Sequence, residues 1–559
     1  MLIQSEVCNW KLLNLNLTNT IIRGGFGMKR RYFVFLLIAV MLFSLVLSGC
    51  QGNNSGVTTA TNATTKDNTG GTETLKHVEL VWYTAVDQVR ADTKMVWDEI
   101  NNYLKETINV TLDYHFFEVN EYNDKITPVM SSGQYVDIVF TGSSFNFVGN
   151  AQNEAFYDIK DLIPQYLPKT QKIIPQGAWD AVTLNGHIYG IPTYKDIADR
   201  FCLLYNKTMT DKYNLDPLES GEWSTVIDTI PFLYEAKAAR DAEQPELADQ
   251  PIIRMLNGLK RFYPLEGLVS VAAVNVPGID AFKGKGSGET VFNIYETDEY
   301  REMCKLINKL VEDRIFPYDH SNFDPDRAFE NSGKLIGTYS GGYIEIKPDI
   351  YAGRETVLST SAQTIMTTQN IQSSIQAVSV QSKNPERSLM FLELLNSDKT
   401  LGNLVRFGIQ GEHYLYNDEG RLDITISPRN KGISSYADYP YYYWYGWTLG
   451  NILAGDLPSV VSKDFGNLLN EMNNSAIQDT NIGFIVDTVP IANEIAACSN
   501  IIAEYDSSTN LRSGMAKDID KTLDEFIAKL KANGSQKIVD EVQKQLTAWR
   551  ASVGKPVKK

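Results

Sequence analysis

The strongest candidate for ligand contact in this sequence is an aromatic run between Tyr436 and Trp447. Aromatic residues are far denser there than the 11% average of the chain. Ring faces stack on the apolar faces of sugar rings, and the OH and NH groups of the rings bond to hydroxyls, so this composition is typical of a carbohydrate cleft. The alternative is an aromatic packing corner that supports a loop. Within the run we expect Trp444 and Trp447 to contact a ligand.

Sequence motifs that carry catalysis are missing. The five histidines are scattered without the spacing of zinc ligands, and no Gly-x-Ser-x-Gly elbow is present. The glycine-rich stretch Lys283–Gly288 lacks the spacing of a phosphate loop, and Asp319–Asp324 lacks the order of a calcium loop. Glycoside hydrolysis needs two carboxylates at a defined separation, which a sequence does not reveal. We therefore expect no enzyme, no cofactor and no metal site.

The N-terminal part has the features of an export signal. Lys29–Arg31 precedes an apolar run, Tyr32–Leu47, and the sequence Leu-Ser-Gly-Cys ends at Cys50. This box resembles that of bacterial lipoproteins, which implies cleavage before Cys50 and a lipid (palmitate) on that cysteine. The alternative, an uncleaved membrane anchor, prefers about 20 residues, whereas this run has 16. Either way we expect the body of the protein on the extracytoplasmic face of the cell membrane, held there by a lipid anchor in the first case.

The residues around this signal give two further expectations. A signal begins at its own methionine, which is Met28, so we expect residues 1–27 to be a start assigned too early and residues 28–49 to be the signal peptide. Residues 50–75 are almost all Gly, Asn, Thr, Ser and Ala. Such a segment buries too little apolar surface to offset its ordering entropy, so we expect a flexible linker.

Composition limits the class of the remaining chain. About 510 residues follow Cys50, and single cores stop growing at about 250–300 residues, so we expect at least two lobes. The net charge of -16 argues against nucleic acid and against a basic membrane-binding face. Three cysteines remain after Cys50, an odd number without close pairs, which argues against a disulfide framework. We expect Cys202, Cys304 and Cys498 to be buried.

The first ordered part of the chain alternates strands with helices. We expect strands at 77–83, 110–117 and 136–140, separated by helices at 91–106 and 122–130. This alternation predicts an α/β fold with a parallel sheet. Ligands bind beyond the carboxyl ends of such strands. The residues at or just beyond those ends, which we expect to contact ligand, are Trp82, Tyr83, Thr141, Ser143 and Ser144.

The order of motifs resembles extracellular solute-binding proteins of the maltose-binding type. The turn into Asp137–Phe140, the signature Asn185–Pro192, the crossing strand Phe201–Asn206, the Ala328–Gly342 element and the helix after Asn384 occur in the family's order. The resemblance implies a two-lobed fold of the periplasmic-binding-protein type (type II) that closes at a hinge. It also implies an ABC importer as partner, with permease subunits that touch both lobes.

The resemblance places further residues at the cleft. Tyr194 and Lys195 follow the signature proline where the chain should cross, although an ion pair with Asp196 is the plainer explanation of Lys195. Tyr339 and Gly341 lie in the strand that ends in glycine, and glycine permits the backbone to approach a ligand closely. A simple turn is the alternative at Gly341.

The C-terminal part resembles one subgroup of these lipoproteins. Phe407–Tyr414, Trp447–Asn451 and Gly483–Thr488 match a subgroup that ends in a domain of unknown function, except that Val486 replaces its usual Phe. Apolar residues recur at helical spacing from Ile491 and again through 515–530 and 538–549. We therefore expect a packed helical unit at 481–559.

Together these observations predict a lipid-anchored receptor that delivers a small solute to an ABC importer by hinge closure. The aromatic residues favour a carbohydrate, most of all an oligosaccharide. A surface-tethered carbohydrate hydrolase and a ligand sensor without a transport role are the alternatives, and we expect a monomer. The predicted N-terminal lobe combines 76–195 with 370–410, and the C-terminal lobe combines 196–369 with 411–480.

Overall fold

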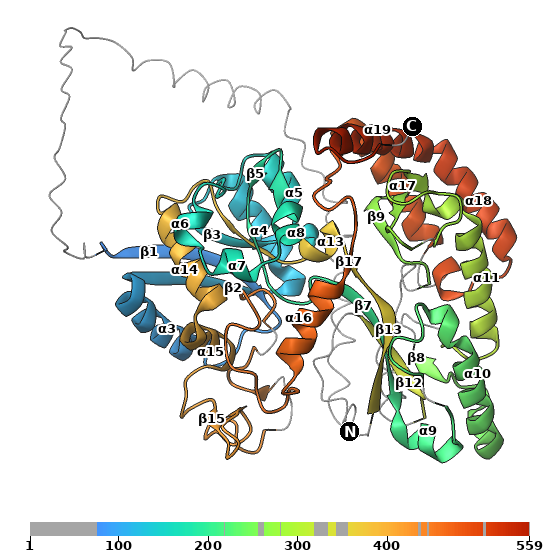
Figure 1. The fold of residues 1–559 in the computed structure, drawn as a ribbon, viewed down its shortest axis with the longest axis horizontal. Coiled ribbons are helices and arrows are strands. Elements are labelled where there is room, and N and C mark those ends of the chain that lie inside the picture. Colours follow the sequence, from blue (N-terminus) through green and yellow to red (C-terminus); the bar gives the residue numbers. More distant parts are fainter. Residues whose placement is uncertain are drawn as a thin grey trace, which may run out of the picture. The chain divides into compact units, whose positions relative to one another are not determined.

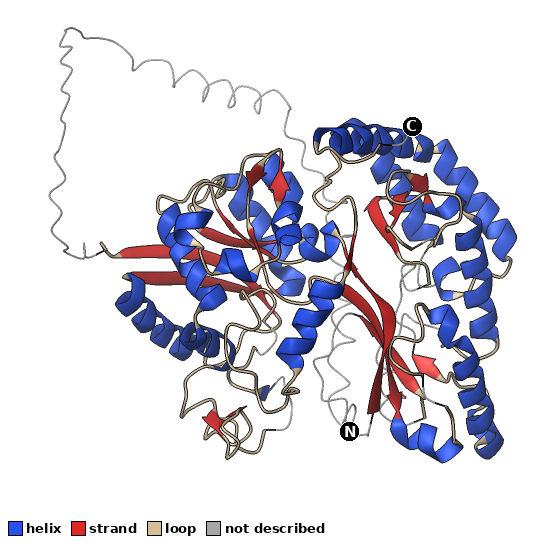
Figure 2. Cartoon of the chain, viewed as in Figure 1, coloured by secondary structure: helices blue, strands red, loops and turns tan. Residues whose placement is uncertain are grey.

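The computed structural model describes residues 75–216, 218–254, 262–279, 281–317, 334–341, 356–433, 438–443, 446–506 and 510–557. The predicted signal peptide, Cys50 and Trp444 lie outside these residues. Figures 1 and 2 show a chain in which helices alternate with short strands over the first part and dominate the C-terminal part. No helix within the described ranges is both long enough and apolar enough to cross a membrane.

The first sheet contains the strands expected near the N-terminus. Its order is β2-β1-β3-β14-β6, with β1 parallel to β2 and to β3, and β14 antiparallel to β3 and β6. Helix α4 (Val119–Ser132) packs on β1, and the residues from Trp82 to Val86 are all buried, which explains the apolar run of this strand. The strands are β1 (Val78–Val86), β2 (Val110–Glu118), β3 (Ile138–Thr141), β6 (Ile191–Pro192) and β14 (Ile375–Val378).

Helices pack against this sheet through apolar residues three or four positions apart. In α3 (Thr93–Ile108) the buried residues include Trp97, Ile100 and Leu104, and Asn109 ends the helix in the left-handed region at φ 48°. Helix α3 contacts β2 and α15. The other helices of this part are α4 (Val119–Ser132), α5 (Phe147–Gln152), α6 (Ile163–Tyr166), α7 (Thr170–Ile173), α8 (Gln176–Ala181), α13 (Thr368–Ile371), α14 (Pro385–Ser397), α15 (Lys399–Phe407) and α16 (Phe465–Ser475).

A second sheet has the order β17-β13-β7-β12-β8. Strand β7 runs antiparallel to both β12 and β13. A separate three-stranded sheet has the order β11-β10-β9. The strands are β7 (Asp199–Asn206), β8 (Ile253–Arg254), β9 (Leu265–Val269), β10 (Ala272–Asn275), β11 (Phe292–Asn293), β12 (Gly337–Gly341), β13 (Thr356–Met366) and β17 (Ile477–Gln478). The helices of this part are α9 (Lys207–Tyr213), α10 (Val226–Glu243), α11 (Asp298–Glu312), α17 (Ala492–Tyr505), α18 (Ile519–Ala532) and α19 (Ser535–Ser552).

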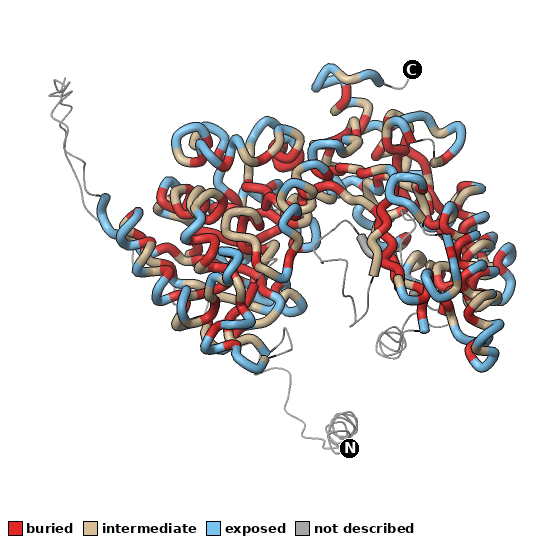
Figure 3. The backbone as a smooth tube through the Cα atoms, turned by 60° about the horizontal axis from the view of Figure 1, so that its bottom comes forward, coloured by how far each residue is buried: buried red, intermediate tan, exposed pale blue. Residues whose placement is uncertain are grey.

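Two hydrophobic cores divide the folded body, and Figure 3 shows buried backbone running through both. The first core draws on residues 80–198 and 366–482, and the second on 201–339 and 484–546. Within the described residues the chain therefore passes between the cores three times, near Asp199, Met366 and Phe484. Two α/β cores joined by crossing segments agree with the predicted two-lobed fold.

The expected place of residues 411–480 differs from the structure. We predicted this stretch in the C-terminal lobe, but Tyr414, Leu422 and Leu469 belong to the first core. The reason is that the third crossing lies near Phe484, about seventy residues later than the sequence boundary suggested, so everything before it packs on the first sheet's side.

The C-terminal helices have the expected apolar stripes but no separate core. Leu523, Phe526 and Leu530 of α18 are wholly buried. The ring of Phe526 lies edge-to-face on Tyr295, with the ring centroids 5.0 Å apart. The described helices after Phe484 therefore complete the second core, whereas we predicted a helical domain of its own at 481–559.

Candidate functional site

Two neighbouring cavities lie near the crossings, and residues of the crossing strands β7 and β13 line the first of them. The first has a volume of about 230 Å³, and the second has a volume of about 240 Å³. Both are lined by Glu266, Gly267 and Gln369, so we treat them as one feature, the crossing groove. The first cavity is also lined by Asp199, Phe201, Ser224, Pro264, Leu265, Ile294, Ser361, Gln363, Ile365, Thr367 and Asn370. The second is also lined by Ser143, Val148, Leu268, Val269, Thr368, Gln372, Phe484, Ile485, Val486 and Thr488.

Strand geometry explains how these side chains reach the groove. Successive residues of a strand point to opposite faces, so Asp199 and Phe201 of β7 share one face. On the other face Arg200 donates from Nε to the hydroxyl of Thr364, at 2.7 Å. Ser361, Gln363 and Ile365 of β13 line the same cavity, again two positions apart. Each crossing strand thus gives alternate residues to the groove.

The ring of Phe201 is held in place by aromatic neighbours. Tyr339 stacks on it with centroids 5.0 Å apart, and Trp223 meets it edge-on at 5.6 Å. The Tyr339 hydroxyl bonds to the Thr229 hydroxyl, and burial raises the pKa of Tyr339. Tyr339 is therefore behind the groove wall, not at the ligand contact we predicted. Gly341 pairs with Phe201 in the β12–β7 ladder.

The lining has the chemistry of a site for hydroxyl-rich solutes. Amide side chains such as Gln363 both donate and accept hydrogen bonds, and the carboxylates Asp199 and Glu266 accept them. Phe201 adds an aromatic surface. No group of His, Cys, Asp and Glu side chains that could hold a metal ion occurs among the described residues.

The loop after β3 reaches the second cavity through Ser143. Its backbone N–H donates to the carbonyl of Gln372 at 2.7 Å. This close approach requires glycine at position 142, because a Cβ there would lie 2.8 Å from the carbonyl oxygen of Ser373. Ser144 is exposed next to the cavity, and Thr141 is buried and donates its hydroxyl to the carbonyl of Phe145 at 3.1 Å. Of these three predicted residues, only Ser143 lines the groove.

Trp82 and Tyr83 are core residues in this structure. Trp82 is wholly buried against Trp97 and Phe391, and its Nε1 donates to the Gln376 side chain at 3.1 Å. Tyr83 is buried and stacks on His115 with centroids 4.3 Å apart. We expected the strand to end at these residues, but β1 continues to Val86, so both rings lie in its interior and no ligand can stack on Trp82.

Tyr194 and Lys195 bond to neighbouring protein residues just before the first crossing between the two cores. The Tyr194 hydroxyl donates to the Asn470 side chain of α16 at 2.5 Å. Lys195 forms an ion pair with Asp196, with 3.0 Å between Nζ and Oδ1, and Asn473 donates to the Lys195 carbonyl. Neither lines the crossing groove, so the simpler interpretation of Lys195, an ion pair, describes the structure.

Most of the aromatic run forms a packing corner. Tyr441 donates its hydroxyl to the Val405 carbonyl at 2.9 Å, and Tyr443 donates to the Gln88 carbonyl at 2.7 Å. Trp447 is half-buried and edge-to-face with Phe140, whose centroid is 5.5 Å away. Its place beside the end of β3 is near Ser143, but it is not among the residues that line the groove.

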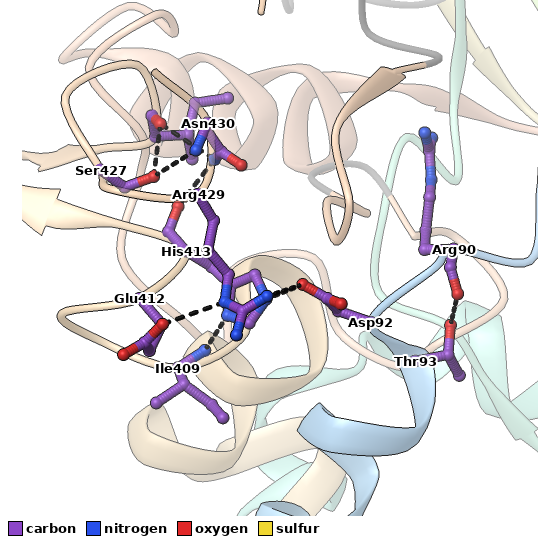
Figure 4. Close-up of polar contacts among 10 residues, drawn as sticks. Arg90, Asp92, Thr93, Ile409, Glu412, His413, Ser427, Arg429 and Asn430 are labelled. Carbon is purple, nitrogen blue, oxygen red and sulfur yellow. Dashed lines mark hydrogen bonds and ion pairs between the residues drawn. The ribbon is translucent and has the colours of Figure 1, made fainter.

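A polar network beside this corner was not singled out from the sequence (Figure 4). The backbone N–H of Ile409 donates to Nδ1 of His413 at 3.1 Å, so Nε2 carries the proton and donates to Asp92 at 3.2 Å. Arg429 bonds to Asp92 and to Glu412, each at 2.9 Å. Burial lowers the pKa of His413. The network ties the start of α3 to the loop after α15.

Sequence reasoning missed most of the groove. Asp199 lies two residues before Phe201, where the expected crossing strand began, and the two-residue period of a strand would have placed it on the same face. Glu266 and Gln363 carry no comparable signal, because their strands had not been predicted.

Comparisons with known proteins describe the same architecture. A family model described as a domain of unknown function (DUF3502) matches residues 480–551. A carbohydrate ABC transporter substrate-binding protein of Streptococcus pneumoniae serotype 4 is 24% identical over 451 residues, which cover 80% of this chain and 86% of that protein. The predicted resemblance to solute-binding proteins with this C-terminal domain is thus confirmed.

Solved structures share the fold. The N-glycan transport solute-binding protein of Streptococcus pneumoniae is 22% identical, with a TM-score of 0.67 over 84% of this chain and 98% of that chain. Its complex with Man5GlcNAc, also 22% identical, gives a TM-score of 0.62 over 85% of this chain and 99% of that chain. These likenesses confirm the predicted type II solute-binding fold.

Proposed function

We propose that this protein is the extracytoplasmic receptor of an ABC importer and that the crossing groove captures an oligosaccharide. The observation that carries the proposal is the groove itself. Polar side chains from both crossing strands, Asp199 and Gln363 among them, line it together with the ring of Phe201. The name of the relative, a carbohydrate ABC transporter substrate-binding protein, supports the choice of ligand and of partner.

The groove also supports capture by hinge closure. Its second cavity takes Ser143 and Val148 from the side of the first core, and Leu268 and Val269 from the side of the second. A ligand that bonds to both sides stabilises the arrangement in which they are close, and the equilibrium shifts by its differential affinity for that arrangement. The capture step involves no covalent chemistry.

Mannose-rich glycans are the first ligands to test. The structurally similar N-glycan transport protein was solved with Man1GlcNAc and with Man5GlcNAc. In this chain we propose that Trp447, half-buried near the end of β3, extends the ligand contacts beyond Ser143. We also propose that Cys50 carries the lipid anchor and that permease subunits bind the closed receptor.

The proposal is tested by a thermal-shift screen of oligosaccharides, followed by chromatography of the recovered sugar. A bound sugar at a hundred times its Kd should stabilise the fold by about 2.7 kcal/mol by mass action, and the sugar should be recovered intact. Shortened products would instead support the hydrolase alternative. If none of the oligosaccharides stabilised the protein, the proposed function would be wrong.

A further inference from the structure

A third cavity, the outer cavity, adjoins the crossing groove. It has a volume of about 800 Å³ and shares Ser224, Pro264 and Gln363 with the groove. The remaining lining residues belong to the second core's side of the molecule, chiefly the segment before β9, the loop 278–285 and the start of α11. The outer cavity and the groove are therefore neighbours, separated by no more than these shared side chains.

Size favours a role for this cavity in binding a long ligand. Ligand pockets are usually about 300–1,000 Å³. The two cavities of the groove, at about 230 and 240 Å³, are each smaller than that, whereas the outer cavity falls within the range. A ligand that filled only the groove would be small, and an oligosaccharide needs the additional volume.

The wall of the outer cavity combines a ring with carboxylates. Tyr263 is half-buried, and its ring packs on Phe282 with centroids 5.5 Å apart. Tyr263, Glu299 and Glu302 all line this cavity, and burial, followed by the charges of the two carboxylates, raises the pKa of Tyr263. Glu299 and Glu302 are three residues apart on α11, so they lie on one face of the helix. A ring face beside carboxylate acceptors suits the apolar face and the hydroxyls of a sugar.

The charges around the cavity are unbalanced. Its described lining includes five carboxylates and two lysines, a net charge of -3. Three of the carboxylates have nearby partners. Asp228 accepts from the backbone N–H of Thr225, Glu299 accepts from the backbone N–H of Lys283 at 3.0 Å, and Glu296 pairs with Lys531. Like charges repel, so this lining disfavours a sugar that carries its own carboxylate. The charged residues are Asp228, Glu296, Asp298, Glu299, Glu302, Lys283 and Lys285.

We propose that the outer cavity is a second sugar subsite, in which Tyr263 stacks on a distal unit of a neutral oligosaccharide while Glu299 and Glu302 exclude anionic sugars. The inference rests on the proposed function and adds to it the length and the charge of the ligand. Short ligands occupy the groove alone, and longer neutral ligands continue into the outer cavity.

The first experiment compares Man1GlcNAc with Man5GlcNAc by calorimetry on the wild type and on Tyr263→Ala. We expect the affinity for Man5GlcNAc to fall about tenfold when the stacking surface is removed, and the affinity for Man1GlcNAc to stay the same. Tyr157→Phe, at an exposed tyrosine on the first core's side, is the matched control. Equal effects on both glycans, or none on either, would overturn the subsite.

The second experiment tests the charge with a hexauronate, which has six sugar units like Man5GlcNAc but a carboxylate on each. The wild type should bind it far more weakly than Man5GlcNAc, and Glu299→Gln/Glu302→Gln should raise the ratio of the hexauronate affinity to the Man5GlcNAc affinity about fivefold or more. High salt should reduce the difference between the affinities of the wild type for the hexauronate and for Man5GlcNAc. Equally tight binding of both glycans by the wild type would overturn the charge selection.

These outcomes separate the inference from the proposed function. If the wild type binds Man1GlcNAc and Man5GlcNAc and Tyr263→Ala changes neither, the outer cavity is not a subsite but the receptor function stands. If Man5GlcNAc does not bind while another oligosaccharide does, the proposed subsite is again wrong and the receptor function again stands. If no oligosaccharide binds, the proposed function and the inference are both wrong. Glu525→Gln, at an exposed carboxylate of α18, is the control for the charge variants.

Discussion

The aromatic residues of the first core and those that line the cavities differ in their polar surroundings. In the first core, Trp82 and Tyr443 are buried, and their NH and OH groups bond to other protein atoms. At the cavities, Phe201 and Tyr263 lie among carboxylates and amides that also line the open space. The comparison teaches that a high density of aromatic residues does not by itself indicate a binding site. What matters is whether the adjacent hydrogen-bonding capacity is directed inward or towards a cavity.

The largest effect that sharpens this comparison concerns Trp82. We predict that Trp82→Ala lowers the free energy of unfolding by about 3–5 kcal/mol, because a wholly buried ring is replaced by a void. Urea denaturation measures the change. Trp82→Phe, which keeps most of the volume, should cost less and should bind oligosaccharide as the wild type does. Loss of affinity in Trp82→Phe without loss of stability would contradict the assignment of Trp82 to the core.

The next effect concerns Asp199 in the groove. We predict that Asp199→Ala weakens oligosaccharide binding by about 1.5–3 kcal/mol, or about ten- to a hundredfold, because a charged hydrogen-bond acceptor is lost. Calorimetry measures the affinity. Asp98→Ala, which removes an exposed carboxylate of α3, should leave it unchanged. If both variants bound equally well, the groove would not be the binding site.

A smaller effect is expected at Tyr443. We predict that Tyr443→Phe lowers the free energy of unfolding by about 1 kcal/mol, because the donor to the Gln88 carbonyl and the acceptor for the Arg90 N–H are lost together. Affinity for oligosaccharide should be unaffected. Tyr157→Phe, at an exposed tyrosine, should change stability by less than about 0.5 kcal/mol. Weaker binding by Tyr443→Phe would instead indicate that the aromatic run is part of the binding site.

The smallest effect is a pH dependence from His413. Burial lowers its folded-state pKa below the unfolded value of about 6.5, so between the two values the unfolded state binds more protons. The stabilisation is complete above about pH 6.5 and is lost as the pH falls towards the folded pKa, where a proton on Nδ1 would also displace the Ile409 bond. His413→Gln should flatten the fall in stability between pH 7 and 5, measured by denaturation, and His77→Gln, an exposed control, should not.

Much of the fold was predictable because its signals are local. Strands near 78, 110 and 138 and helices α3, α17, α18 and α19 follow from apolar periodicities that neighbouring residues set among themselves. The boundary between the two cores was less predictable. It depends on which sheet a segment packs against, and the stretch from Tyr414 to Leu469 has no local feature that distinguishes the two.

The candidate site was harder to predict than the fold. Of the predicted contacts, Ser143 lines the groove, because it follows a strand whose end was placed within one residue. Trp82 and Tyr339 had the right residue type, but burial on all sides is a property of their neighbours. Tyr263 and Glu266 come from one short segment and Gln363 from a strand much later in the chain, and nothing in these local sequences relates the two segments to one another.

Residue periodicity and motif order alone determine that this chain is an α/β protein with crossing strands and a helical end, because hydrophobic spacing and turn residues act over a few positions. The direction in which each aromatic ring faces was decided by strand pairing and packing. Strand β1 belongs to a sheet with packed faces, so Trp82 is buried, whereas the crossing strand β7 lies beside a cavity that Asp199 and Phe201 line.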